Sequence, residues 1–168
     1  LAVPGFSPVY LRNGTVYGVS PRLRVDIVLN NLVGWAHTTG KIKLYTDGTP
    51  WRPLVHVEDV CRAFLVALEA PANVIHNQVF HVGSNQENYQ IIQLAKIVQK
   101  VVPGCEIEFD PNHDGDQRTY IADFTKIETL LPQFRPQWDA EAGAMQLHHA
   151  YRDADLTLDE FSSSRYIR

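Results

Sequence analysis

The sequence predicts an α/β or α+β fold in which strands and helices pack as layers. Short runs of β-favouring or alternating residues are interspersed with longer stretches whose apolar residues recur every three or four positions. Glycine and proline punctuate the boundaries between the two kinds of segment. Because strand and helix patterns alternate along the chain, a layered arrangement around one core region is expected. The sequence contains no internal repeat and no low-complexity segment.

The strand patterns are short and end at turn residues. Residues 41–45 alternate polar and apolar side chains, the period-two pattern of a half-buried strand. Residues 78–83 run into a glycine turn, and residues 8–12 are bounded by proline and Asn13-Gly14. Strands are therefore predicted at 8–12, 41–45, 78–83 and 105–109, with a further short strand at 119–122.

Helices are predicted at 23–38, 58–69, 90–102, 124–131 and 140–151. The second of these has Glu58 and Asp59 in its first turn, where the helix dipole favours negative charge, and it ends before Pro71. Cys61 falls within this helix and is expected in the core.

Composition excludes several classes of protein. The 168 residues are 45% hydrophobic and 20% charged, which is typical of a globular chain. The formal charge of -4 gives no reason to expect nucleic acid or an anionic membrane as a partner, and no apolar stretch is long enough to span a bilayer. Two cysteines are too few for a disulfide scaffold, so we expect a cytoplasmic, reducing environment.

No metal site is expected. The loop that begins at Asp110 has acidic residues at alternating positions before Gly115, as calcium loops do, but its twelfth position holds Ile121 instead of the required glutamate. His148 and His149 are adjacent on a predicted helix and therefore point in different directions.

Two arginines stand where a ligand could be held. Arg12 lies near the end of a predicted strand, just before Gly14, and strand ends are where α/β proteins bind ligands. Arg52 precedes a short apolar stretch at 54–57 and a helix, and a guanidinium group there offers a forked donor that suits phosphate. Taken alone, both arginines are better explained as members of surface ion pairs.

Four segments in this order resemble the C-terminal half of the extended short-chain dehydrogenase/reductase family, the nucleotide-sugar epimerases and dehydratases. They are RNGTVYG (12–18), WRPLVHVEDVCRAFLVALEAP (51–71), FHVGSNQENYQIIQLAKIV (80–98) and GDQRTYIADFTKIETLLPQF (115–134). The resemblance covers most of the chain from Pro8 to about Tyr151.

The resemblance implies that residues 1–168 are the C-terminal, substrate-binding portion of an NAD(P)-binding Rossmann-type enzyme. The last parallel strands, about 8–13 and 78–83, would be interleaved with a small α/β substrate domain. In this family a glycine-rich loop binds NAD or NADP, and a Tyr-x-x-x-Lys pair does the proton chemistry. Neither motif occurs in the sequence. We therefore expect the catalytic residues and the dinucleotide-binding half upstream, and an isolated chain that is inactive.

The resemblance also implies site residues. No catalytic residue is expected within the chain; those expected to bind substrate are Thr15, Tyr17, Asn30, Asn31, Arg52 and Arg118, and those expected to contact the cofactor are Arg12 and Thr15. Packing is an equal alternative for Tyr17, and a solvated helix face for the two asparagines. Many relatives carry Arg-Pro-Gly-Asp where this chain has residues 113–116, so their second phosphate-binding arginine is missing at that place.

The partners that the resemblance implies are a nucleotide sugar and the N-terminal half of the same enzyme. Strands that belong to a larger parallel sheet would expose edges and apolar faces when that half is missing, so a homo-oligomer is expected for the isolated chain. The alternative is a stand-alone sugar-nucleotide binding module without catalysis.

Overall fold

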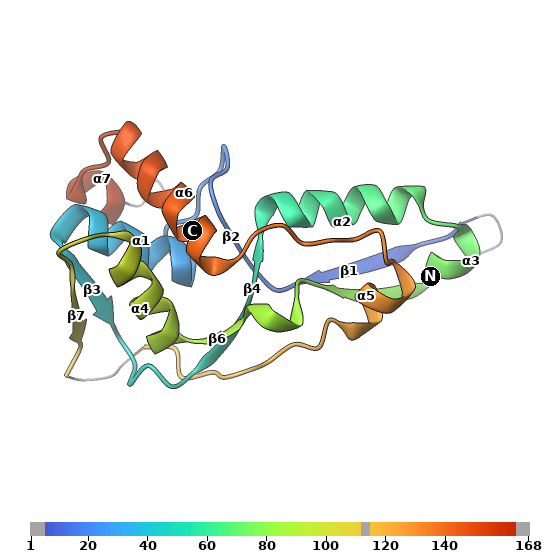
Figure 1. The fold of residues 1–168 in the computed structure, drawn as a ribbon, viewed down its shortest axis with the longest axis horizontal. Coiled ribbons are helices and arrows are strands. Elements are labelled where there is room, and N and C mark those ends of the chain that lie inside the picture. The colour runs from blue at the N-terminus through green and yellow to red at the C-terminus, as the bar shows by residue number, and fades with distance from the viewer. Residues whose placement is uncertain (1–5, 112–114, 164–168) are drawn as a thin grey trace.

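The computed structural model describes residues 6–111 and 115–163, and it has the expected α/β architecture. The molecule is elongated, with two lobes at the ends of its long axis (Figure 1). One lobe contains β1, β5, α2, α3 and α5, and the other contains α1, α4, α6, α7, β3 and β7. Three short strands, β2, β4 and β6, lie between them. We call the two ends the β1 lobe and the α1 lobe.

The β1 lobe is built on two parallel strands. β1 (Val9–Asn13) pairs with β5 (Gln78–Val82) in parallel. Helix α2 (Val57–Glu69) runs along one side of this pair and α5 (Thr125–Leu130) along the other, with α3 (Ala72–Ile75) at the far end (Figure 1). The core of this lobe is made of Val55, Val60, Ala63, Phe80, Val82, Phe124, Ile127, Leu131 and Phe134.

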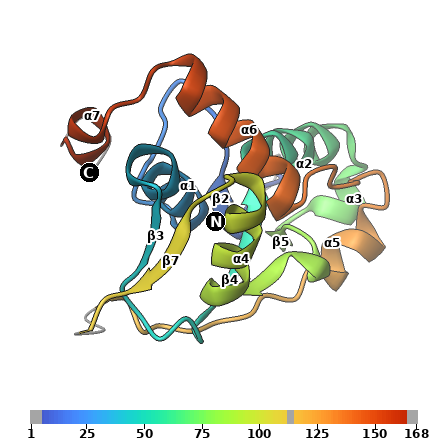
Figure 2. The same ribbon diagram turned by 60° about the vertical axis from the view of Figure 1, so that its left-hand side comes forward.

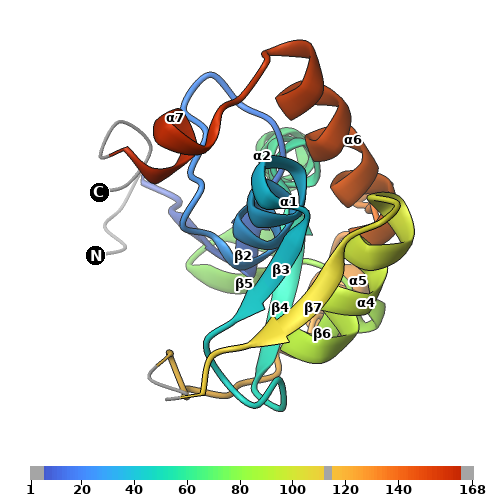
Figure 3. The same ribbon diagram turned by 90° about the vertical axis from the view of Figure 1, so that its left-hand side faces the viewer.

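The α1 lobe packs helices against a second parallel pair, β3 (Lys41–Leu44) and β7 (Glu106–Phe109). Figures 2 and 3 show these two strands side by side. The helices are α1 (Val28–Thr39), α4 (Ile91–Val101), α6 (Ala140–Asp153) and α7 (Leu158–Ser162). Helix α1 ends at Gly40, whose φ of 69° is the left-handed conformation that glycine adopts without strain.

The central sheet joins the lobes through β4. β2 (Thr15–Tyr17) pairs with β4 (Trp51–His56) in parallel, and β6 (Asn88–Gln90), which follows the 3₁₀ turn Asn85–Glu87, pairs with β4 antiparallel. Successive side chains on a strand point to opposite faces. Leu54 therefore lies in the core of the α1 lobe and Val55 in the core of the β1 lobe.

Asp59 ties the segment before α6 to helix α2. Its carboxylate is 1% exposed and accepts hydrogen bonds from the backbone amides of Gln137 (3.0 Å) and Trp138 (3.1 Å). Arg62, one helical turn further on, donates to the same carboxylate at 2.9 Å. The chain between the β1 lobe and α6 is thus fixed by one buried anion whose hydrogen bonds are satisfied.

A second buried carboxylate is less well paired. Glu87 is 8% exposed; its Oε1 accepts a hydrogen bond from the Tyr89 hydroxyl at 3.0 Å, whereas its Oε2 has no hydrogen-bond partner among the described residues. Burial raises the pKa of Glu87 to about 7, and the nearby Asp139 and Asp59 act in the same direction.

Most of the predicted elements are confirmed within a few residues, and three predictions are wrong. Helix α1 begins at Val28 instead of Leu23, because residues 21–27 form turns. Residues 119–122 form no strand. The Tyr120 amide donates to the Trp51 carbonyl at 3.3 Å, but the neighbouring bonds involve side chains: the Thr119 hydroxyl accepts from the Trp51 amide, and the Asn88 side chain bonds to the backbone of Ala122. Cys61 is exposed instead of buried, because the apolar face of α2 that meets the core is the one that carries Val60 and Ala63.

None of the helices in the described ranges has the length and apolar character that a bilayer crossing requires. The segment that resembles a calcium loop includes residues 112–114, which lie outside the described part of the chain.

Asp59→Asn is expected to lower the free energy of unfolding by about 2–4 kcal/mol, because an amide offers one acceptor oxygen where three donors now converge. Urea titration followed by circular dichroism measures this change. Glu58→Gln is the matched control: its side chain is 48% exposed, so its loss should cost about 0.5 kcal/mol or less. Equal effects of the two substitutions would contradict the role assigned to Asp59.

Glu87 should make the protein less stable as pH rises. Its folded-state pKa of about 7 lies above the ordinary value of 4.5, so between these pH values the folded state holds a proton that the unfolded state has lost. The contribution of this group to stability therefore falls by up to about 3 kcal/mol between pH 4.5 and 7. In Glu87→Gln, unfolding free energies measured at pH 5 and pH 8 should differ less than in the wild type. An unchanged difference would show that Glu87 does not titrate in this range.

Candidate functional site

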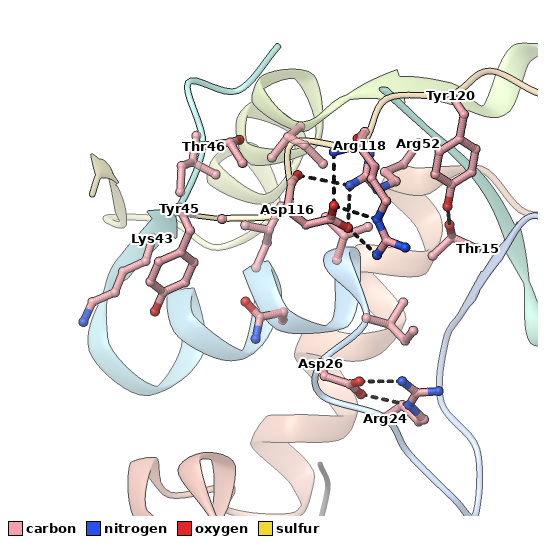
Figure 4. Close-up of a pocket in the computed structure, with 17 residues that line it drawn as sticks. Thr15, Arg24, Asp26, Lys43, Tyr45, Thr46, Arg52, Asp116, Arg118 and Tyr120 are labelled. Carbon is pink, nitrogen blue, oxygen red and sulfur yellow. Dashed lines mark hydrogen bonds and ion pairs between the residues drawn. The ribbon is translucent and has the colours of Figure 1, made fainter. Parts of the chain in front are cut away.

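An open pocket of about 370 Å³ lies on the α1 lobe, beside the central sheet. Its walls are the first half of α1, the end of β3, the start of β4 and the segment 115–120, which crosses in front of β4 (Figure 4). Four cationic and two acidic side chains are among its described lining residues: Arg24, Lys43, Arg52 and Arg118, with Asp26 and Asp116. We call it the arginine pocket. Its excess of positive charge contrasts with the net charge of -4 of the whole chain.

Arg52 is the buried cation of this pocket. It lies on the face of β4 that carries Leu54, and it is 8% exposed. Its Nη1 donates to the carbonyl oxygens of Trp51 (2.8 Å) and Arg118, and its Nη2 approaches the carboxylate of Asp116 at 3.0 Å. The Tyr120 ring lies 5.2 Å from the guanidinium carbon, within the range of a cation–π contact. A buried guanidinium held this way is fixed in position before any ligand arrives.

The second arginine pairs with the same acid. Arg118 donates from Nε and Nη2 to the two carboxylate oxygens of Asp116 at 2.8 and 2.7 Å, in the forked arrangement typical of arginine. These hydrogen bonds, with the charge of Arg52, hold the pKa of Asp116 well below its usual range. Unlike Arg52, the Arg118 side chain is 82% exposed.

Gly115 sets the path of this segment. Its amide donates to the carbonyl of Tyr45 at 2.7 Å, and a Cβ at this position would lie 2.5 Å from that same oxygen. Only glycine permits so close an approach between the two backbones. Asn88 and Asn85 hold the downstream part through the backbone of Ala122 and Phe124, so the segment that carries Asp116 and Arg118 is pinned at both ends.

A second pocket, of about 450 Å³, adjoins the first and shares Thr15, Arg24, Ile27 and Tyr120 with it. The hydroxyls of Thr15 and Tyr120 lie 3.5 Å apart, at the boundary between the two (Figure 4). Thr15 thus stands at the junction of two open spaces.

Two amide side chains of α1 hydrogen-bond to the backbone of the loop at 18–25, which forms the rim of both pockets. Asn30 is buried; its Oδ1 accepts from the Gly18 amide at 3.1 Å and its Nδ2 donates to the Arg24 carbonyl at 2.8 Å. Asn31 donates to the Val25 carbonyl at 3.0 Å. The neighbouring Tyr17 is 2% exposed, and its hydroxyl donates to the Asp139 carbonyl at 2.9 Å.

His56 is a packed residue that joins helices. It is 1% exposed, stacks on Trp138 with ring centroids 4.0 Å apart, and its Nδ1 accepts from the Glu58 amide at 3.2 Å as the N-cap of α2. With Nδ1 an acceptor, Nε2 carries the proton and donates to Gln146 at 2.9 Å. Burial lowers the pKa of His56.

The structure divides the residues that the sequence pointed to among three places. Thr15, Asn31, Arg52 and Arg118 line the arginine pocket, and Thr15, Tyr17 and Asn30 line the second pocket. Arg12 is exposed on β1 and lines neither. The site residues that sequence reasoning missed are Asp116, Tyr120 and Lys43. Gly115-Asp116 was the available signal, because it stands in the quoted GDQR segment beside Arg118.

Of the two candidates for cofactor contact, Thr15 lines both pockets, whereas Arg12 is exposed on β1 and lines neither.

The chain matches known proteins over most of its own length. The family described as NAD dependent epimerase/dehydratase matches residues 2–83. A UDP-glucuronate 4-epimerase of Thermodesulfobacterium geofontis is 25% identical over 79% of this chain, and UDP-glucuronic acid decarboxylase 4 of Arabidopsis thaliana is 31% identical over 66% of it. The chain spans only 39% and 25% of these two relatives.

Solved structures agree with the sequence matches. The UDP-glucuronic acid 4-epimerase of Bacillus cereus, solved with UDP-glucuronic acid and NAD, superimposes with a TM-score of 0.72 at 26% identity, covering 87% of this chain and 45% of that one. The UDP-glucose 4-epimerase of Thermotoga maritima, solved with UDP-glucose, gives a TM-score of 0.69 at 28% identity, covering 86% of this chain and 45% of that one. The family match, the sequence relatives and the solved structures all indicate the NAD-dependent epimerase/dehydratase family of extended short-chain dehydrogenases/reductases, to part of which this chain is similar.

Proposed function

We propose that this chain is the substrate-binding portion of an NAD(P)-dependent nucleotide-sugar epimerase or dehydratase, and that the arginine pocket holds the diphosphate of the substrate. The observation that carries the proposal is Arg52, a buried guanidinium fixed by backbone carbonyls at the wall of an open, positively charged pocket. Guanidinium groups bind phosphate oxygens through forked hydrogen bonds, and fixed donors of this kind lose little entropy on binding.

The sugar would extend from the arginine pocket towards the second pocket. Thr15 and Tyr120 place two hydroxyl groups at the junction, where they could hydrogen-bond to a sugar or to the nicotinamide end of a cofactor. The relatives with solved complexes bind UDP-glucuronic acid or UDP-glucose, so a nucleoside diphosphate is the appropriate first probe.

Hydride and proton transfer are assigned to residues outside this chain. Because the sequence contains neither the glycine-rich loop nor Tyr-x-x-x-Lys, we propose that the chain alone binds a nucleotide sugar without turnover. A chain that binds a nucleotide sugar and functions without a catalytic half would instead be a stand-alone sugar-nucleotide binding module.

Two surfaces of the β1 lobe are suited to contact with a partner. Among the described residues β1 pairs only with β5, which leaves its other edge without a strand. On α2, Cys61, Phe64, Leu65 and Leu68 follow an i, i+3, i+4, i+7 spacing and are exposed, Leu68 by 80%. We propose that the N-terminal half of the enzyme covers these surfaces, and that the isolated chain associates with itself through them.

Arg52→Lys keeps the positive charge but loses the fork, so it should weaken UDP binding about tenfold or more. Isothermal titration calorimetry of the 168-residue chain measures the dissociation constant, and a thermal melt checks that the variant is folded. Arg152→Lys, at a position exposed by 61% and outside the pocket, is the matched control and should bind as the wild type does. If a folded Arg52→Lys variant bound UDP as tightly as the wild type, the placement of the diphosphate in this pocket would be contradicted.

Leu65→Glu combined with Leu68→Glu should shift the isolated chain from oligomer towards monomer in sedimentation velocity, because the substitutions place charge on the exposed face of α2. Leu158→Glu, at an exposed apolar residue of α7, is the control and should leave the distribution unchanged. A wild-type chain that sediments as a monomer at all concentrations would contradict the self-association.

A further inference from the structure

Asp116 lies where an anion between two arginines would lie. Its Oδ1 accepts from Nε and from the backbone amide of Arg118, at 2.8 and 3.1 Å. Its Oδ2 lies 2.7 Å from Nη2 of Arg118 and 3.0 Å from Nη2 of Arg52. The carboxylate is thus bound by the two guanidinium groups that a phosphate would use (Figure 4).

The two arginines are held unequally. Arg52 is nearly buried and keeps its carbonyl partners on Trp51 and Arg118, whatever the carboxylate of Asp116 does. In the described part of the chain, the side-chain hydrogen bonds of Arg118 go to Asp116, and this side chain is 82% exposed. A long, exposed side chain held by one ion pair exchanges its partner at little cost.

The backbone of Asp116 is the fixed part of the arrangement. Gly115 is bonded to Tyr45, and Arg52 donates to the carbonyls of Asp116 (3.3 Å) and Arg118. Because the backbone on both sides is anchored, the carboxylate stays beside Arg52 while the Arg118 side chain is free to turn.

We propose that Asp116 is a built-in counter-anion of the arginine pocket, and that a diphosphate binds by taking Arg118 away from it. The proposal rests on the proposed function of this pocket and adds a determinant of its affinity and selectivity. Asp116 leaves the Arg52–Arg118 pair with a formal charge of +1 instead of +2. A ligand must therefore compete with the Asp116 carboxylate for Arg118. A diphosphate competes better than a single carboxylate because it brings more charge and more acceptor oxygens.

Asp116→Asn tests this directly. Removing the competing charge should tighten UDP binding about two- to fivefold, the range that an exposed ion pair represents, and should steepen the dependence of affinity on salt. The gain should be smaller when Arg118→Gln is already present, because only the Asp116–Arg52 ion pair then remains to be released. Asp153→Asn, which removes a carboxylate paired with Arg152 outside the pocket, makes the same change in net charge and should leave affinity unchanged.

The outcomes separate the two proposals. If folded Asp116→Asn bound UDP no more tightly than the wild type does, the counter-anion proposal would be overturned and the proposed diphosphate site would stand. Absence of UDP binding in both the wild type and Asp116→Asn would overturn the proposed function, and the counter-anion with it. Nitrogen NMR of the Arg118 side chain supplies an independent readout. In the free protein the hydrogen bond to Asp116 should slow the exchange of Hε with solvent, and the Nε–Hε signal should shift when UDP is added. A signal that UDP binding leaves unchanged would overturn the exchange of partners.

Discussion

The alternation of side chains along β4 is the constraint on which the rest of the structure depends. Leu54 faces the core of the α1 lobe and Val55 faces the core of the β1 lobe, so one six-residue strand contributes a side chain to each of two hydrophobic cores. The same alternation places Arg52 and His56 on the Leu54 side. Arg52 therefore opens onto the arginine pocket, while His56 caps α2 and contacts α6 through Gln146. A shift of one residue in the register of β4 would exchange all of these positions.

Around β4, polar side chains fix the backbone that apolar packing leaves undetermined. Asp59 holds the chain before α6, and Asn85 and Asn88 hold the segment that leads from the pocket to α5. Arg52 belongs to this group, because two of its hydrogen bonds go to carbonyls of the segment that carries Asp116. The pocket is therefore built from the same interactions that place the connecting segments. The Arg52 side chain is rigid because it holds one of these segments.

Local periodicity predicted the amphipathic helices well. The observed bounds of α2 and α4, Val57–Glu69 and Ile91–Val101, lie within one residue of expectation, because each buries one face of a regular pattern. None of the three strands of the central sheet was predicted. β4 was recognised only as a short apolar stretch at 54–57, and the three-residue strands β2 and β6 exist through pairing with β4 and carry almost no signal of their own. Arg52 and Thr15 could be selected from motif resemblance. Asp116 stands in the GDQR segment that carries Arg118, but its contact with Arg52, 64 residues away in sequence, is a property of the fold and could not be predicted.

Within the described ranges, the side chains of Asn30 and Asn31 hydrogen-bond to main-chain atoms of the loop that forms the pocket rim: the amide of Gly18 and the carbonyls of Arg24 and Val25. Main-chain atoms are the same whichever residue carries them. The side chains at positions 19–24 can therefore change through mutation while the loop keeps its path. Such a loop is a place where new ligand preferences can evolve without loss of the fold, because its pocket-lining side chains, Ser20, Arg22 and Arg24, are not the groups by which Asn30 and Asn31 hold it.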